Sequence, residues 1–491
     1  MKKTLKAISP LIASILLIVV AVILVTIVLA FGKGFTTDAL DKTQGIGDIL
    51  PSDVTHFIFP KAYEEGIIQF TYSPPSSLQG KTISITSYQI LELPDVAPIT
   101  LTTPYTLKEG TNTLPLNCLY EHALSSPDFT IQLITEDNTY ITIKQRDVGM
   151  VCSSTGDGSE ATPKIICSAE DLNAVRENLD WNYALGKDID LQCFSRQTEE
   201  GWDPIGYDWS DYFQGNFDGK GNTIKNLYIY RPSQNNIGLF GFVENSEINN
   251  LGVVDVNITG KSSVGGIIGR SLENIMSFSF SKGRIIGDAS VGGLIGVSGD
   301  TEILYSFADI YVSGSFYLGG LIGDAANGPN GVIDNCYSKG VIDASSLTSS
   351  YSSGGLVGIL AGELYNSYSE VDIIDVINAL VFAGGLIGST TDDMGDIYIS
   401  NVYSFGAISG TGTLSGLIGE YSEPILVHTI NSYWNTETSG QATSAGGEGK
   451  TTEEMKQRST YVGWDFDTVW QIQEGVTYPY LRSNPQSPPP Q

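Results

Sequence analysis

Basic residues are scarce in this sequence. Lys and Arg together number 26 in 491 residues, against 55 Asp and Glu, so the formal net charge is −29. Because proteins bind nucleic acid through clustered Lys and Arg, this balance excludes nucleic acid as an expected partner. No Lys or Arg occurs between Lys339 and Lys450, so this stretch lacks the basic side chain with which a lyase abstracts a proton.

Cysteine is also rare. The five cysteines are too few for a disulfide-based scaffold, and they lack the spacing of metal ligands. If the chain folds outside the cell, two local pairs can form. We predict the disulfides Cys118–Cys152 and Cys167–Cys193, with Cys336 free. The alternative is that the cysteines are buried free thiols.

Close groups of titratable side chains are few. The three histidines lie far apart in the sequence, outside recognisable catalytic motifs. One tight group of acids, Asp392, Asp393 and Asp396, occurs in the stretch STTDDMGD. It is either a solvated acidic loop or a weak Ca²⁺ site, since oxygen-rich turns suit this cation. We therefore expect no catalytic residues and no cofactor.

The N-terminus contains a long uncharged run. No residue from Ala7 to Gly32 is charged. A helix over Pro10–Phe31 would be about 33 Å long, which is enough to cross a bilayer. Lys2, Lys3 and Lys6 precede it, so the positive-inside rule leaves the N-terminus in the cytoplasm and the body of the chain outside.

The junction between the basic leader and this apolar run carries a resemblance. Lys6-Ala7 followed by Ile8-Ser9-Pro10 resembles the class III signal peptide of archaeal type IV pilins and archaellins. The resemblance implies that a prepilin peptidase cleaves between Ala7 and Ile8 and that the mature helix packs with other pilin subunits. The alternative is an uncleaved single-pass anchor.

The rest of the chain divides by pattern into further segments. Short alternating strand-like pieces separated by turn residues predict an antiparallel β-sandwich, and a polar stretch follows it. The expected organisation is a leader (1–7), a membrane helix (8–33), a stalk (34–53), a β-sandwich (54–152), a linker (153–163), a repeat region (164–483) and a disordered Pro-rich tail (484–491).

The repeat region is marked by glycine tetrads. GLFG at 238–241 is followed by GIIG, GLIG, GLIG, GLVG, GLIG and GLIG, the last at 416–419, with ends 28, 27, 27, 35, 30 and 31 residues apart. Each period holds about three short β-like pieces, none of helical length or periodicity. One such unit cannot bury its apolar face alone, whereas stacked copies can. We therefore predict a parallel β-helix, right-handed, of about ten coils.

This region resembles the GLUG-repeat family of surface proteins. The resemblance rests on the tetrads, on an opening segment that runs from SAEDLNAVRENL through WDPIG and FQGNFDGKGNTIKNLYI, and on a closing segment NSYWNTETSGQATSAGGEGKTTEEM. It implies a surface or adhesin-like role. Asn257 begins the one N-x-[ST] acceptor, where glycosylation is plausible.

A second repeated theme places Asn two residues before Tyr. The pairs are Asn335/Tyr337, Asn366/Tyr368, Asn401/Tyr403 and Asn431/Tyr433. Either the tyrosines form a stripe that binds sugar rings, or Asn and Tyr form ladders that hold neighbouring coils together. Equal spacing in every coil is what packing requires, so we favour the ladders.

These observations together predict a pilin-like, membrane-inserted surface protein that displays an adhesive or recognition rod. Its expected partners are the membrane, a prepilin peptidase, other pilin subunits and a surface glycan or protein. Two other functions are considered: a membrane-anchored polysaccharide-degrading enzyme, and a purely structural spacer of the envelope.

Overall fold

The structure, a computed structural model, describes two compact units, Met1–Gly149 and Met150–Gln491, which we treat separately. The described residues are 57–64, 67–73, 82–91, 98–115, 130–138, 140–144, 152 and 154–491, the last range with gaps at 193, 195–197, 327, 329, 347–350, 378–380, 392–394, 422–425 and 485. The predicted leader, membrane helix and stalk lie outside them. Within the described part of the chain, no helix is long and apolar enough to cross a membrane.

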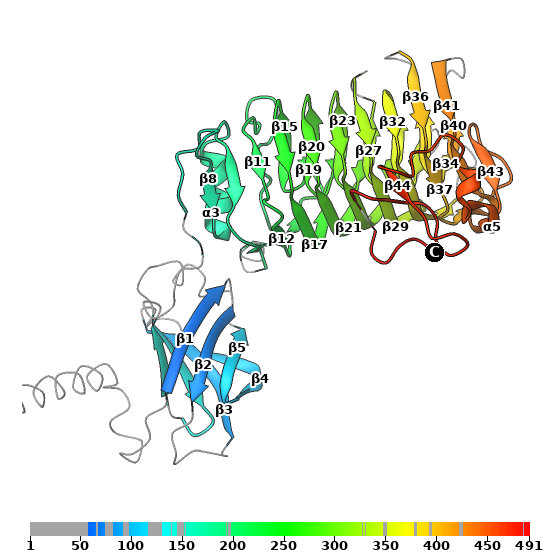
Figure 1. The fold of residues 1–491 in the computed structure, drawn as a ribbon. Coiled ribbons are helices and arrows are strands. Elements are labelled where there is room, and N and C mark those ends of the chain that lie inside the picture. Colours follow the sequence, from blue (N-terminus) through cyan, green and yellow to red (C-terminus); the bar gives the residue numbers. More distant parts are fainter. Residues whose placement is uncertain are drawn as a thin grey trace, which may run out of the picture. The chain divides into compact units, whose positions relative to one another are not determined.

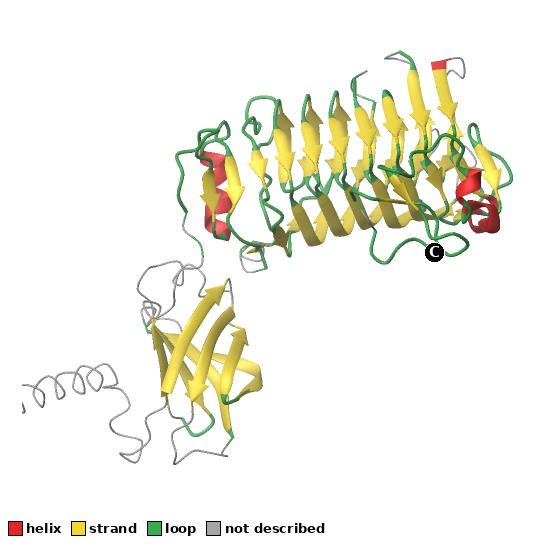
Figure 2. Cartoon of the chain, in the orientation of Figure 1, coloured by secondary structure: helices red, strands yellow, loops and turns green. Residues whose placement is uncertain are grey.

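The first unit consists of two antiparallel sheets (Figures 1 and 2). The three-stranded sheet has the order β1 (Phe57–Glu64), β2 (Ile67–Ser73), β5 (Gly110–Pro115). The four-stranded sheet has the order β4 (Ile99–Leu107), β3 (Ile83–Ile90), β6 (Thr130–Thr135), β7 (Tyr140–Lys144).

One buried cluster draws side chains from both sheets of this unit. Phe70 and Leu114 come from the smaller sheet, and Tyr88, Leu133 and Ile143 from the larger one. The antiparallel pairing follows from the alternation of apolar and polar residues along each piece. The closed β-sandwich over 54–152 stays a prediction, because several connections between these strands lie outside the described residues.

The second unit is a parallel β-solenoid whose coils stack side by side (Figure 1). Each of seven coils contributes one strand to each of two seven-stranded sheets. The first of these sheets contains β14 (Asn235–Ile237), β18 (Ser262–Val264), β22 (Ala289–Gly292), β26 (Phe316–Gly319), β30 (Ser352–Gly354), β34 (Phe382–Gly384) and β39 (Thr413–Ser415). The second contains β15 (Phe240–Glu244), β19 (Ile268–Leu272), β23 (Ile295–Gly299), β27 (Ile322–Ala325), β31 (Val357–Leu360), β35 (Ile387–Thr390) and β40 (Ile418–Glu420).

Two longer sheets complete the coils. The ten-stranded sheet contains β8 (Lys164–Ile166), β9 (Tyr183–Leu185), β11 (Phe217–Asp218), β16 (Glu247–Asn249), β20 (Ile275–Ser277), β24 (Glu302–Leu304), β28 (Val332–Asp334), β32 (Glu363–Tyr365), β36 (Ile397–Ser400) and β41 (Val427–Ile430). The twelve-stranded sheet contains β10 (Ile189–Asp190), β12 (Thr223–Lys225), β13 (Tyr228–Tyr230), β17 (Gly252–Thr259), β21 (Phe280–Ile286), β25 (Phe307–Ser313), β29 (Tyr337–Asp343), β33 (Tyr368–Val376), β37 (Tyr403–Ser404), β38 (Ile408–Gly410), β42 (Tyr433–Asn435) and β43 (Glu448–Lys450).

We number the coils 1 to 7 from β14–β17 to β39–β42. The parallel solenoid confirms the fold predicted for the repeat region, with about eight turns where about ten were expected. The difference arises because the strands before β14 enter only the two longer sheets and do not form complete coils. The right-handed sense of the coil stays a prediction.

Equivalent residues of successive coils lie in register. Ile268, Ile295 and Ile322 are paired across neighbouring strands, and all three are fully buried. The middle Leu of the tetrad, such as Leu321, is buried as well. Like side chains therefore stack at the spacing of parallel strands, about 4.8 Å, and form one continuous core.

The tetrad glycines are required for space. A Cβ atom on Gly320 would lie 2.0 Å from the carbonyl oxygen of Gly355 in the next coil. Positive φ angles occur instead at the asparagine corners, with 56° at Asn335, 41° at Asn366 and 55° at Asn401. Asn tolerates the left-handed region better than most residues, so it turns the chain while glycine lets the coils approach.

Both ends of the solenoid are covered. At the N-terminal end, beside β8, lie α3 (Ala169–Asn173), capped by Ser168, and a 3-10 helix (Ala174–Glu177). The other end carries α4 (Thr436–Ser439), α5 (Thr452–Met455), a 3-10 helix (Arg458–Thr460) and the short pair β44 (Trp470–Gln471) and β45 (Tyr480–Leu481). Covering the terminal strands protects open edges from pairing with other chains.

The C-terminal segment, residues 456–491, folds back along the twelve-stranded sheet (Figure 1, red). Asn484 and Gln486 are buried there, and the Tyr368 hydroxyl donates a hydrogen bond of 2.9 Å to Gln486 Oε1. The prediction of a disordered tail over 484–491 is therefore wrong. Its polar side chains find partners on the outer face of the sheet, which composition alone does not show.

The disulfide prediction is also wrong, because the structure pairs Cys152 with Cys167. Residues 154–163, expected to be a linker, turn back on the first strand, and the amide of Ile165 donates to the carbonyl of Thr155 at 2.7 Å. This reversal brings the two cysteine Cα atoms to 5.6 Å, within the range that a disulfide spans. Cys118 and Cys193 lie outside the described residues, and Cys336 is a buried free thiol, as predicted.

Candidate recognition surface

The predicted acidic group is only partly described. Asp392 and Asp393 lie outside the described residues, whereas Asp396 is described and exposed. Its carboxylate lies 3.7 Å from His428 Nε2 and accepts a 3.4 Å hydrogen bond from the Tyr398 hydroxyl, and the rings of Tyr398 and His428 stack. Among the described residues no group of three His, Cys, Asp or Glu side chains is arranged to hold a metal.

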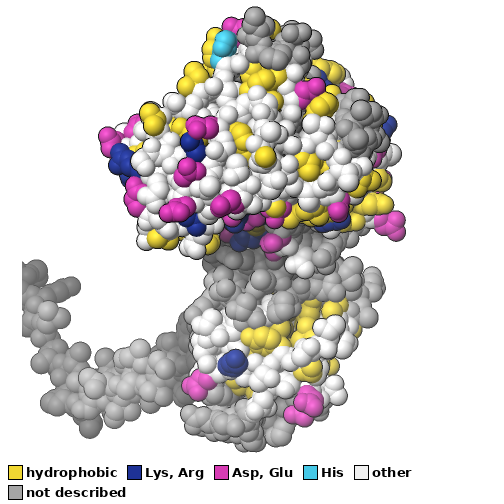
Figure 3. All heavy atoms as spheres, turned by 90° about the vertical axis from the view of Figure 1, so that its right-hand side faces the viewer, with side chains coloured by type: hydrophobic (Ala, Val, Ile, Leu, Met, Phe, Trp, Pro, Cys, Tyr) yellow, Lys and Arg dark blue, Asp and Glu magenta, His cyan; other side chains and the backbone are white. Residues whose placement is uncertain are grey.

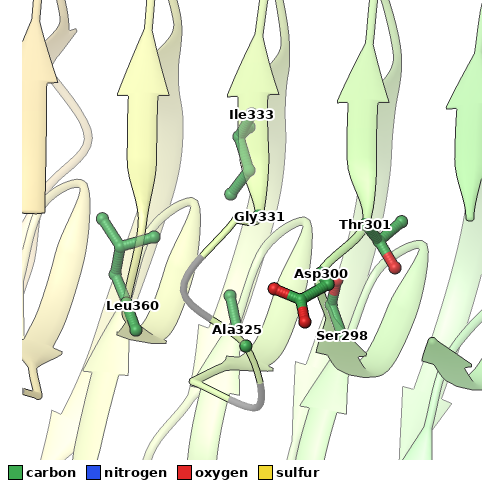
Figure 4. Close-up of a pocket in the computed structure, with 9 residues that line it drawn as sticks. Ser298, Asp300, Thr301, Ala325, Gly331, Ile333 and Leu360 are labelled. Atoms are coloured by element: carbon green, nitrogen blue, oxygen red, sulfur yellow. The ribbon is translucent and has the colours of Figure 1, made fainter. Parts of the chain in front are cut away.

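A small cavity lies where β23 and β27 turn toward the ten-stranded sheet (Figure 4). Ser298, Asp300 and Thr301 line one side, and Ala325 and Leu360 the other. Its volume of about 10 Å³ holds one water molecule and no substrate. The Asp300 carboxylate accepts a hydrogen bond from the amide of Asn330 at 2.8 Å, which favours a structural role in the turn.

The repeated tyrosines are packed as ladders. The rings of Tyr337 and Tyr368 lie 5.1 Å apart with planes 8° from parallel, and those of Tyr368 and Tyr403 are 5.1 Å apart at 15°. The C-terminal segment covers them, so their exposed fractions are only 3%, 0% and 0%. Ring faces that are occupied by one another cannot stack on a sugar, and this arrangement favours the ladder interpretation.

The repeated asparagines hold the corners. Asn366 Nδ2 donates to the carboxylate of Asp334 at 2.9 Å, and Asn401 Nδ2 donates to Asn366 Oδ1 at 3.4 Å. These bonds run from coil to coil. They satisfy polar groups at a position where the backbone needs a residue that accepts positive φ.

An exposed aromatic cluster, which the sequence reasoning missed, lies before the first complete coil. We define the recognition cluster as Tyr207, Trp209 and Tyr212. Trp209 is 61% exposed and Tyr207 44% exposed, which is uncommon for side chains of this size. The run YDWSDY is the signal that could have pointed to it, since three aromatic residues alternate there with acids and a serine.

The loop that carries this cluster is fixed to the solenoid. Trp209 and Tyr212 pack against the buried ring of Phe242 in β15, at centroid distances of 4.7 and 5.5 Å. The guanidinium of Arg270 in β19 lies 5.3 Å from the Trp209 ring. The rings of Trp209 and Tyr212 are therefore held in place before any ligand arrives.

Polar groups surround the cluster. The Asp208 carboxylate accepts hydrogen bonds from the Ser210 hydroxyl at 2.6 Å and the Ser210 amide at 2.8 Å, which hold its pKa below the ordinary value. The negative charge of Glu244 beside Tyr212, together with a hydrogen bond between them, raises the pKa of the tyrosine hydroxyl. The cluster thus combines flat apolar rings with fixed hydrogen-bond acceptors.

Asn257, the predicted glycosylation residue, is exposed on β17. Its side chain lies on the outer face of the twelve-stranded sheet and is accessible to a modifying enzyme. The processing residues Lys6, Ala7 and Ile8 lie outside the described residues. Figure 3 views the second unit from its C-terminal end, where acidic and basic side chains are interspersed with isolated apolar ones.

Comparisons with known proteins find related sequences in proteins that are longer than this chain. No family model matches the chain. A Gly-rich membrane protein of Evansella cellulosilytica is 32% identical over an alignment 412 positions long, which covers 68% of this chain and 46% of that protein. Halomucin of Haloquadratum walsbyi is 31% identical over 137 residues, 26% of this chain and 2% of halomucin. The chain thus spans less than half the length of either relative.

Two solved structures show distant similarity. A Bacteroides ovatus protein assigned as an immunoglobulin A1 protease aligns with a TM-score of 0.43 at 20% identity, covering 67% of this chain and 94% of its own. A structure named IgA1 protease aligns with a TM-score of 0.38 at 18% identity, covering 77% of this chain and 27% of its own. Similarity at this level carries no argument about activity.

Proposed function

We propose that this chain is a membrane-anchored surface protein whose β-helical unit is a rod for recognition and adhesion. The predicted membrane helix 8–33 would anchor it, with the N-terminus in the cytoplasm and the body outside. The name of the Evansella relative, a membrane protein, supports this location, as does halomucin. The class III leader supports handling by a prepilin peptidase and association with other pilin subunits.

The observation that carries recognition is the fixed, exposed position of Trp209. The interior of the solenoid is filled by stacked apolar side chains, so ligand contact must occur on its outer surface. Trp209 is 61% exposed, so the fold does not gain the free energy of burying this large ring. The surrounding carboxylates accept hydrogen bonds. A flat ring beside such acceptors suits a neutral glycan, whose sugar rings present an apolar face and hydroxyl donors.

Glycan binding by the full chain in detergent tests this proposal. We expect binding to neutral oligosaccharides on an array, and its loss when Tyr207 and Trp209 are both replaced by Ala. Tyr230→Ala is the matched control, since that side chain is 51% exposed elsewhere on the unit. Binding that survives the double replacement would contradict a role for the cluster.

The proposed role is non-catalytic. The alternative of a polysaccharide-degrading enzyme predicts that the purified chain depolymerises polyuronides, which a reducing-sugar assay detects directly. A spacer predicts neither depolymerisation nor binding to glycans or cells. Location is tested separately, by labelling intact cells with an antibody against the β-helical unit and observing the surface and any pili by electron microscopy.

A further inference from the structure

The C-terminal segment covers only part of the aromatic row on the outer face of the twelve-stranded sheet. On the outer face of the twelve-stranded sheet, Tyr337 is buried beneath the C-terminal segment, whose Asn484 side chain donates to the carbonyl of Asn335. The same row runs on into coils 2 and 3 as Phe280 and Phe307. Both rings stay partly exposed, although they stack at 4.9 Å and continue the ladder without a break.

Coils 2 and 3 also depart from the repeat at their corners. Where coils 1 and 4 have Asn250 and Asn335, these two coils have Phe278 and Tyr305, with φ angles of 49° and 50°. The left-handed region is unfavourable for such residues, whose Cβ atom crowds the following carbonyl oxygen. The two rings stack at 4.8 Å and 7°, and Phe278 is 49% exposed. Strain and exposure in adjacent coils mark a surface that is kept for contact.

The outward residues beside these rings alternate in charge. Lys282 in coil 2 is in register with Asp309 in coil 3, and Arg284 is in register with Tyr311. The Lys282 ammonium lies 5.6 Å from the Phe307 ring centroid, and the Arg284 guanidinium lies 5.0 Å from that of Tyr311. The charged outward residues of β21 are thus both cations, whereas β25 has Asp309 and Tyr311. The Asp309 carboxylate also forms an ion pair of 3.1 Å with Lys339 of coil 4, so a second copy's Lys282 would share this acid with Lys339.

This arrangement is self-complementary. Consider a two-fold rotation about an axis that lies in the plane of contact, parallel to the strands and midway between β21 and β25. A second copy placed by this rotation sets its Asp309 opposite Lys282 and its Arg284 opposite Tyr311. Each favourable contact then occurs twice, which is the property of an interface between identical subunits.

We propose that this pairing face, the outward residues of β21 and β25 with Phe278 and Tyr305, binds the same face of a second copy of the chain. The face consists of the outward residues of two strands and two corner residues, so we expect pairing between free chains to be weaker than across the roughly 1,200–2,000 Å² of a stable interface. Anchoring in one membrane raises the effective concentration and makes a weak contact sufficient to hold rods side by side.

Energy transfer between donor- and acceptor-labelled full chains, mixed in detergent micelles with excess empty micelles, tests the proposal. We expect Lys282→Glu alone and Asp309→Lys alone each to weaken pairing about tenfold or more, because like charges then face each other twice. An equal mixture of the two variants should pair as the wild type does. Lys220→Glu, a charge reversal on an exposed turn, should change nothing.

The mixture distinguishes pairing from a folding defect, since two misfolded variants cannot restore each other. A wild type without concentration-dependent transfer, or a mixture no better than its components, would overturn the proposal and leave the face to a different partner. Energy transfer caused by association of the membrane helices is the same in all variants, so it does not affect the comparison between them. Glycan binding should be unchanged in these variants, so failure of pairing and failure of the recognition cluster are separable.

Discussion

At the scale of single residues, glycine and asparagine divide two tasks that the sequence pattern alone does not separate. The tetrad glycine Gly320 provides space for the backbone of the next coil, whereas Asn335 and its equivalents accept positive φ. Both residue types recur once per coil, so the period shows that they matter without showing which task each performs.

Gly320→Val should prevent or severely destabilise folding, because its Cβ atom would lie 2.0 Å from a backbone oxygen that cannot move alone. Gly331→Ala is the matched control. Its Cβ would meet nothing closer than 3.8 Å, and we expect a change within about 1 kcal/mol. Thermal unfolding followed by circular dichroism compares the two, and equal tolerance would mean that the coils are not packed as described.

Leu321→Ala should lower the free energy of unfolding by about 2–5 kcal/mol through the cavity it leaves. The side chain is fully buried, with equivalents in the coils on either side at Leu294 and Leu356. Chemical denaturation of the full chain measures the loss. A change below about 1 kcal/mol would place this residue near solvent and contradict the register.

At the scale of elements, the C-terminal segment is the part that departs most from the repeat. Its aromatic side chains form a cluster with the tyrosine ladder, and Trp470 in β44 is fully buried within it. This segment converts the outer face of a solenoid sheet into a second, smaller core.

Trp470→Ala should therefore cost about 3–5 kcal/mol, as expected when a large ring is removed from a core. Tyrosine fluorescence and quencher access should report newly exposed rings of Tyr368 and Tyr403. Val462→Ala, at a position 71% exposed in the same segment, is the control and should be near neutral. Unchanged quenching in the Trp470 variant would show that the segment does not depend on this contact.

Glu370, on the sheet beneath this segment, supplies a pH-dependent contribution. Burial raises the pKa of its carboxyl above the ordinary value of 4.5, opposed by a hydrogen bond from Gln486 and by the charge of Lys339. The folded state therefore holds the proton more tightly than the unfolded state. The contribution of Glu370 to stability is most favourable below pH 4.5 and declines as pH rises through the raised pKa.

Glu370→Gln removes this decline. Relative to the wild type, the variant should gain free energy of unfolding between pH 4 and pH 7, when both are measured by denaturant titration at each pH. Parallel stability curves for the two proteins would show that the carboxyl does not titrate differently in the folded state.

At the scale of the whole molecule, the N-terminal prediction decides how the rod is carried. If a prepilin peptidase cleaves after Ala7, the mature chain from its native host begins at Ile8 and retains the apolar segment. Intact-mass analysis checks this. A chain beginning at Met1 would indicate an uncleaved anchor, and one beginning beyond Phe31 would indicate a secreted product.

The solenoid could be predicted from the repeats, because every coil must bury the same apolar face. A unit with a Gly tetrad, an apolar face and an Asn corner buries its side chains only against its own copies, so the period predicts the fold, the buried Leu321 and the Asn and Tyr ladders. In a repeat protein each unit contacts only its neighbours, so the pattern of one unit predicts the contacts between units.

The features that do not repeat could not be predicted in this way, because they depend on contacts between distant parts of the folded chain. The contact from Asn484 to Asn335 joins residues 149 positions apart, and the Cys152–Cys167 pair depends on a chain reversal before the first coil. Trp209 and Phe278 carry no periodic signal that marks them as exposed. Such contacts form where surfaces meet once, so their free energy depends on the assembled solenoid and not on any local pattern.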